Sequence, residues 1–144
     1  MIKTTTGACV VAGTFLALTL GVAQKRAPET PQEKHLSDSF RGPELFKAYC
    51  ATCHGRDAKG DGPMAASLKV APADLTRIAE RNGGKFPFLQ VQKIIAGEQQ
   101  PPGVHGTREM PVWGPIFSEV SWDQDLGRVR IYSLALYLES IQVK

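Results

Sequence analysis

The sequence contains few cysteines, little net charge and no clear strand pattern. Three cysteines are present in 144 residues, and no second C-x-x-C or H-x-x-x-H spacing would complete a four-ligand zinc site. The formal charge is +3 and the basic residues are scattered, so we expect no nucleic acid among the partners. No segment alternates apolar and polar residues, which disfavours half-buried β-strands. These absences leave a helical protein with about one compact domain.

The first 23 residues are predicted to be a signal peptide or an N-terminal membrane anchor. Lys3 gives the segment a positive start, and residues 7–23 contain no charged side chain. Ala23 is a small residue of the kind that a signal peptidase reads, so we expect cleavage before Gln24. The uncharged stretch of 17 residues also reaches the lower limit for spanning a bilayer. A retained membrane tether through residues 7–23 is therefore the alternative.

The rest of the chain divides into a linker and a domain. Residues 24–38 hold two prolines and many charges but almost no apolar residue, which predicts a flexible linker. Residues 39–144 are predicted to form an all-α domain, because apolar residues recur at helical spacing between start and stop signals. Such a domain with long loops requires something further to pack around. About four short helices are expected, beginning near Pro43, Asp74, Pro87 and Ser121, with loops over residues 55–72 and 99–115. The third of these helices is expected to stop at Gly97.

One short motif carries the chemistry: Cys50-Ala51-Thr52-Cys53-His54. Its C-x-x-C-H spacing places two thiols to add across the two vinyl groups of one haem, with the adjoining histidine beneath the iron. Three other uses of the cysteine pair stay open. These are a zinc site that lacks two ligands, a disulfide whose loop is too short to stabilise much, and a thioredoxin-like pair without its sheet. The helical context and the export segment favour one covalent haem c with its iron.

The domain resembles the single-haem class I cytochromes c over nearly its whole length. Gly42 and Phe46 precede the C-x-x-C-H motif, and Leu134 and Tyr137 lie in the last predicted helix. The resemblance implies that the first and last helices cross closely, with a small residue at the crossing and interlocked aromatic rings. It also implies the cytochrome c fold, in which short helices and long loops surround the haem.

A proline carbonyl is implied on the histidine side of the haem. The segment Gly60-Asp61-Gly62-Pro63 resembles the family's loop in which a proline carbonyl accepts a hydrogen bond from Nδ1 of the axial histidine. Pro63 is identified with that residue, and Pro72 is the competing one. Such a bond would fix the tautomer of His54 and strengthen its donation to iron.

A methionine is the family's usual second axial ligand. Met110 stands in a loop before the last helix, and the Pro111-Val112-Trp113-Gly114 that follows resembles the family's methionine loop. Met64 comes only ten residues after His54 and is expected on the histidine side. His105 is the rival ligand. Arg108 and Trp113, with Arg77, could hold the haem propionates, although solvated arginines explain the pattern as well.

Occupation of both axial positions would leave no site for a substrate, so the chain is predicted to be an electron carrier and not an enzyme. We expect a periplasmic protein, soluble or anchored to the inner membrane, that passes single electrons among redox partner proteins of a respiratory chain. It would act as a shuttle or as a subunit fixed beside a larger complex. The alternative function is a haem enzyme or sensor with a labile sixth ligand, and a third is a non-haem interaction domain.

Overall fold

The structure, a computed structural model, describes residues 28, 30–101, 109–119 and 124–143. The predicted signal peptide or anchor of residues 1–23 lies outside the described residues, so it stays a prediction. Within the described part of the chain, no helix combines the length and the apolar character needed to cross a bilayer.

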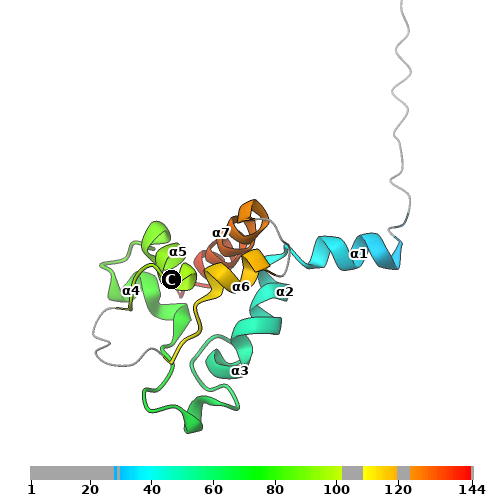
Figure 1. The fold of residues 1–144 in the computed structure, drawn as a ribbon. Coiled ribbons are helices and arrows are strands. Elements are labelled where there is room, and N and C mark those ends of the chain that lie inside the picture. The colour runs from blue at the N-terminus through cyan, green and yellow to red at the C-terminus, as the bar shows by residue number, and fades with distance from the viewer. Residues whose placement is uncertain (1–27, 29, 102–108, 120–123, 144) are drawn as a thin grey trace, which may run out of the picture.

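Every regular element in the described ranges is helical, which confirms the all-α fold class (Figure 1). Three elements run on without a break and form one longer helix that ends with the C-x-x-C-H motif, and a second continuous pair follows later. The elements are α1 (Pro31–Asp38), α2 (Gly42–Leu45), the π-helical η1 (Phe46–Cys50), α3 (Ala51–His54), the 3-10 turns η2 (Ala65–Ser67) and η3 (Leu75–Arg77), α4 (Ile78–Arg81), α5 (Phe88–Ala96), α6 (Trp113–Glu119) and α7 (Gln124–Ser140).

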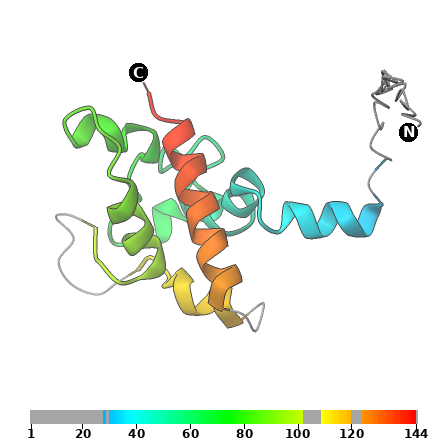
Figure 2. The same ribbon diagram turned by 90° about the horizontal axis from the view of Figure 1, so that it is seen from above.

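Helix α7 is the centre of the domain. Helices α2, α5 and α6 all pack against it, and Figure 2 shows α7 running from beside α6 toward the C-terminus. Burial of apolar side chains along these contacts is the main source of stability in a domain of this size. The buried core consists of Leu45, Phe46, Ala58, Val91, Ile95, Phe117, Ile131, Leu134, Ala135 and Leu138.

The crossing of α2 with α7 depends on Gly42. A Cβ added at Gly42 would lie 2.7 Å from Tyr137 Cβ and would also meet the Ser133 carbonyl oxygen. The ring centroids of Phe46 and Tyr137 are 5.3 Å apart and tilted by 51°, an arrangement that aromatic pairs favour. The predicted close crossing with interlocked aromatic rings is therefore confirmed.

The short middle helices also follow the sequence signals. The Asp74 carboxylate accepts a hydrogen bond from the Thr76 amide at 2.9 Å and so caps η3. Helix α5 stops at Gly97, whose φ of 85° lies in the left-handed region. The predicted start at Asp74 and stop at Gly97 are both confirmed.

Two helices were not predicted. Helix α6 occupies residues 113–119, which overlap the loop expected over residues 99–115; Pro115 is tolerated there because the first turn leaves its amides without helical partners. Helix α1 occupies the second half of the segment expected to be a flexible linker, residues 24–38. Pro31 suits its first turn, and a Lys34–Asp38 ion pair of 2.9 Å joins successive turns. In Figures 1 and 2, α1 points away from the other helices.

Arg130 joins the start of the domain to α7 and α6. Its side chain is buried, and its Nη1 donates to the Phe117 carbonyl at 3.0 Å while its Nε donates to the Ser39 carbonyl at 3.2 Å. The guanidinium carbon lies 5.0 Å from the centroid of the Phe40 ring. Hydrogen bonds and a cation–π contact together satisfy a charge that would be costly to bury alone.

Candidate haem-binding site

The C-x-x-C-H motif occupies the last turn of the helix formed by α2, η1 and α3. The π-helical turn Phe46–Cys50 comes directly before it, and such turns often occur at functional sites. Cys50, Cys53 and His54 are each partly buried and lie within five residues of one another on one helical segment. The structure therefore brings the two thiols and the imidazole together as the motif predicts.

A glycine loop caps the carbonyl end of α3. The amides of Gly60, Gly62 and Met64 donate to the carbonyls of His54, Cys53 and Thr52 at 2.8, 3.1 and 3.0 Å. These carbonyls would otherwise lack partners at the helix end. A Cβ on Gly62 would lie 2.6 Å from the Cys53 carbonyl, so a larger residue could not approach the helix as closely. The loop that follows the motif thus fixes the backbone of the motif itself.

The carbonyl that holds His54 belongs to Ala73 and not to Pro63. His54 Nδ1 lies 3.2 Å from the Ala73 carbonyl oxygen. Because a carbonyl can only accept, this contact puts the proton on Nδ1 and leaves the Nε2 lone pair for a metal. Pro63 is exposed in the loop that caps α3, so its expected role is a wrong prediction. Pro72, the competing candidate, lies one position before Ala73 and is not the acceptor either.

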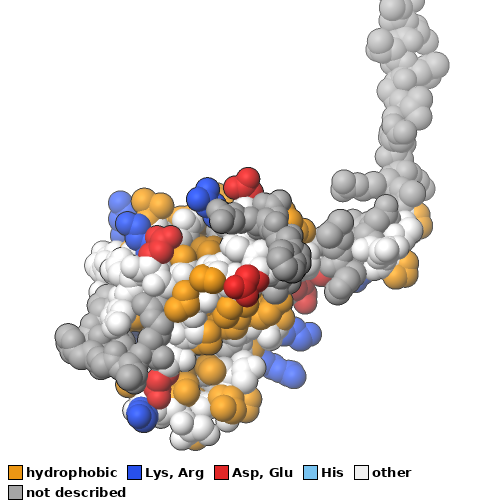
Figure 3. All heavy atoms as spheres, viewed as in Figure 1, with side chains coloured by type: hydrophobic (Ala, Val, Ile, Leu, Met, Phe, Trp, Pro, Cys, Tyr) orange, Lys and Arg blue, Asp and Glu red, His pale blue; other side chains and the backbone are white. Residues whose placement is uncertain are grey.

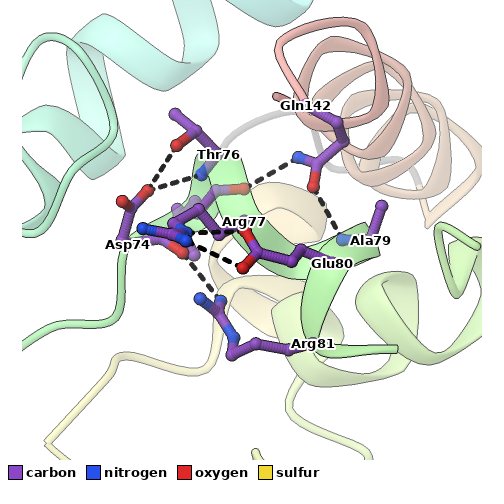
Figure 4. Close-up of polar contacts among 8 residues, drawn as sticks. Asp74, Thr76, Arg77, Ala79, Glu80, Arg81 and Gln142 are labelled. Atoms are coloured by element: carbon purple, nitrogen blue, oxygen red, sulfur yellow. Dashed lines mark hydrogen bonds and ion pairs between the residues drawn. The ribbon is translucent and has the colours of Figure 1, made fainter. Parts of the chain in front are cut away.

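A polar network fixes the segment that carries Ala73 (Figure 4). Arg81 Nη2 donates to the Asp74 carbonyl at 2.7 Å. Gln142 lies just beyond the end of α7; its Nε2 donates to the Leu75 carbonyl at 2.8 Å, and its Oε1 accepts from the Ala79 amide at 2.8 Å. These bonds hold the backbone that follows Ala73, so we expect the position of the Ala73 carbonyl, and with it the orientation of His54, to depend on them.

The electrostatics of the motif favour neutral ligands. Burial lowers the pKa of His54, and the hydrogen bond to the Ala73 carbonyl offsets part of this shift. Because the net shift is downward, the neutral imidazole, which is the form that binds metals, predominates near pH 7. Burial, with a smaller contribution from Cys53, raises the pKa of Cys50 to about 12. A thioredoxin-like nucleophile requires the opposite shift of the thiol pKa. Both cysteines are free thiols, and no cluster of three metal-binding side chains occurs among the described residues.

Met110 and Met64 lie in different surroundings. Met110 is partly buried and packs against the hydrophobic core, whereas Met64 is 46% exposed in the loop that caps α3. Trp113, three residues after Met110, stacks on Phe117 with centroids 5.4 Å apart and contacts Tyr49 edge-on at 5.5 Å. Since Tyr49 precedes Cys50, this contact joins the methionine segment to the motif. Figure 3 shows hydrophobic side chains gathered over α6 and the chain beneath it.

Sequence reasoning missed Glu109, the residue before Met110. Its two carboxylate oxygens accept hydrogen bonds from the amides of Lys69 and Val70, both at 3.0 Å. No spacing signal points to such a contact, because a carboxylate reaching backbone amides about 40 residues away follows no local pattern. The structure thereby ties the methionine segment to the loop on the histidine side.

The structure describes only some of the other residues predicted to contact a haem. Arg108 and His105 lie outside the described residues, so their roles stay predictions. Arg77 pairs with Glu80 at 2.7 Å on the surface. The Trp113 ring packs against aromatic neighbours, and its role toward a propionate stays a prediction.

The donor set fits haem c. Two free thiols on one turn match two vinyl groups, a neutral imidazole offers Nε2, and the Tyr49–Trp113 pair places aromatic side chains beside the motif. Each of these features is present without a competing metal cluster in the ranges described.

Comparison with known proteins supports this identification. A family model described as cytochrome c oxidase, cbb3-type, subunit III matches residues 40–94, a span that includes the motif and most of α5 but not Met110. Neither the curated proteins nor the solved structures compared with the chain gave a significant match. With the helical fold and the motif geometry, the family match supports a c-type cytochrome domain, a kind of domain that serves electron transfer.

Proposed function

We propose that this protein transfers single electrons through one covalent haem c with His54 and Met110 as axial ligands. The observation that carries the proposal is the His54 geometry: Nδ1 is held by the Ala73 carbonyl, next to two free thiols on the same helical turn. An imidazole fixed in this tautomer is prepared for a metal at Nε2. The partly buried Met110 supports the second ligand, because its thioether lies in an apolar segment bordered by Trp113.

Each residue has a distinct role in the proposal. The Cys50 and Cys53 thiols would hold the haem by adding across its vinyl groups, each sulfur gaining a bond to carbon and the thiol hydrogen going to the neighbouring carbon. The His54 imidazole would offer its Nε2 lone pair, and the soft thioether of Met110 would favour the reduced metal and raise the reduction potential. A haem held here would gain and lose one electron reversibly.

A periplasmic respiratory chain is the proposed setting. The matched family is described as a subunit of a cbb3-type cytochrome c oxidase, which favours redox partner proteins of that kind and a place beside a larger complex. Surface charge near the motif is mixed: Lys47 and Arg56 share a groove of about 510 Å³ with Asp57 and Asp61. Recognition of a partner would therefore depend on charge pattern more than on net charge.

Covalent attachment is tested on protein purified from a host with haem-attachment machinery. Haem should migrate with the chain in denaturing electrophoresis and resist extraction by acidified organic solvent. Replacement of both Cys50 and Cys53 by serine should release it. Complete extraction from the wild type would contradict covalent attachment and favour a non-haem or loosely bound state.

Axial ligation is tested by comparing Met110→Ala with Met64→Ala. The ferric wild type should show the weak near-infrared sulfur–iron band. Met110→Ala should abolish it, lower the reduction potential and allow carbon monoxide to bind the ferrous protein. Met64→Ala should change none of these. A wild type that lacks the band and binds carbon monoxide readily would favour the haem enzyme or sensor with a labile sixth ligand.

Export is tested by cell fractionation with N-terminal sequencing. A periplasmic form beginning at Gln24 indicates cleavage, whereas Met1 in a membrane fraction indicates a retained anchor. A soluble cytoplasmic protein with attached haem would contradict both forms of the proposal.

A further inference from the structure

Glu109 makes a contact between two loops that are distant in the sequence. Its Oε1 accepts from the Lys69 amide and its Oε2 from the Val70 amide, each at 3.0 Å. Both oxygens are used, and the two donors are successive backbone amides, so the carboxylate is held in one orientation. Bonds from amides to a charged acceptor are stronger than those between neutral groups.

The two loops belong to opposite sides of the candidate site. Val70 lies three residues before Ala73, the residue whose carbonyl holds His54. Glu109 lies one residue before Met110. The carboxylate therefore joins the segment that orients the histidine to the segment that carries the methionine.

The chain after Met110 is held by apolar packing. A Cβ on Gly97 would lie 3.0 Å from Val112 Cβ, so the Val112 side chain lies directly against the end of α5. Trp113 then begins α6 and stacks on Phe117. Met110 is thus bracketed by a polar anchor on its N-terminal side and an apolar anchor on its C-terminal side.

We propose that Glu109 is a positioning residue for Met110: its bidentate contact with the Lys69 and Val70 amides holds the thioether at the iron. This inference rests on the proposed axial role of Met110. Without the carboxylate, the N-terminal anchor is lost, and the thioether leaves the iron more often. Glutamine cannot replace it, because its amide group would present N–H donors to one of the two backbone N–H groups.

The test uses holoprotein with covalent haem and compares Glu109→Gln with the matched control Glu139→Gln, which removes the same charge from an exposed position on α7. Cyanide binding to the ferric protein reports how often the sixth position opens. Glu109→Gln should accelerate cyanide binding about tenfold and weaken the near-infrared band, a change consistent with the loss of about one to two hydrogen bonds. Hydrogen exchange at the Lys69 and Val70 amides should accelerate in the same variant, and Glu139→Gln should match the wild type.

Three results would overturn the inference. Unchanged cyanide binding and an unchanged band in Glu109→Gln, with faster amide exchange, would mean that the contact holds the loop but not the methionine. Equal acceleration in Glu139→Gln would assign the effect to net charge. A wild type without the band would remove the proposed methionine ligation as well, and this outcome is distinguishable because it appears before any substitution is made.

Discussion

The histidine side and the methionine side of the candidate site are held by different kinds of contact. On the histidine side, loop amides donate to the carbonyls of α3, and the Ala73 carbonyl sits in a network that extends to Gln142. On the methionine side, side chains make the described contacts, namely the Glu109 carboxylate, Val112 and Trp113. Changes on the histidine side should therefore lower the free energy of unfolding, whereas changes on the methionine side should alter ligand binding first.

The largest effect is expected from Gly60→Ala on the histidine side. Gly60 has a φ of 86°, and an added Cβ would meet the Pro72 carbonyl oxygen next to Ala73. We expect the free energy of unfolding to fall by about 3 kcal/mol, from backbone strain and overpacking together. The measurement is urea unfolding of the holoprotein.

Gly83→Ala is the matched control for that variant. Gly83 also has a positive φ, 66°, but no heavy atom lies within 4 Å of an added Cβ. The loss should be limited to backbone strain, about 1 kcal/mol. If the two variants lost equal amounts of unfolding free energy, the close approach of Gly60 to the Pro72–Ala73 segment would contribute nothing to stability.

The next largest effect is expected from Gln142→Ala. The variant loses hydrogen bonds to the Ala79 amide and to the Leu75 and Leu138 carbonyls. A loss of about 2 kcal/mol in unfolding free energy is expected, while the near-infrared band stays unchanged. Ser140→Ala is the control, because it removes one bond, to the Tyr137 carbonyl, at the same end of α7. If Gln142→Ala abolished the near-infrared band without lowering the free energy of unfolding, Gln142 would act on ligation and not on stability, contrary to the expectation for the histidine side.

A smaller effect is expected from Asp74→Ala, which removes the cap of η3. Stability at pH 7 should fall by about 1 kcal/mol. A hydrogen bond from the Thr76 side chain lowers the pKa of Asp74 below its ordinary value of 3.8. The stabilisation is therefore present above the ordinary pKa and is lost as the pH falls through the lowered one. The difference in unfolding free energy between the wild type and Asp74→Ala should shrink below about pH 4. A difference that does not change with pH would contradict this account.

The smallest effect is expected from Arg77→Gln. Arg77 pairs with Glu80 at 2.7 Å, but both side chains are about half exposed. Exposed pairs of this kind contribute little because water and salt screen them. The thermal unfolding midpoint should be unchanged within error, although the pair lies close to the Ala73 segment. A clear decrease in the unfolding midpoint would mean that the Arg77–Glu80 pair helps to hold the Ala73 segment, contrary to this expectation.

The sequence was sufficient for features that follow local rules. C-x-x-C-H specifies its own chemistry, the small Gly42 and the aromatic Phe46 predicted the crossing with α7, and Asp74 and Gly97 marked helix ends. In each case a residue type has a direct geometric requirement, such as a positive φ or a close approach. Such requirements can be read without knowledge of the path of the chain.

Features that depend on the path of a loop could not be predicted in the same way. The acceptor for His54 is the Ala73 carbonyl because Gly60 lets the chain pass close to Pro72, and any residue type offers a carbonyl. Helix α6 begins with Trp113-Gly114-Pro115, a composition that also favours a loop. Glu109 had no distinguishing signal, because its partners are backbone amides.

The buried Arg130 gives the domain a mechanical property. Its guanidinium donates a hydrogen bond to the Ser39 carbonyl and lies over the Phe40 ring. Both residues lie where the chain enters the domain, just ahead of the helix that ends in the motif. Tension arriving along α1 would be taken up by α7, and through the Phe117 carbonyl by α6, before it reached Cys50. A force applied through α1 would therefore act on the packed helices α6 and α7 before it acted on the helix that ends in the motif.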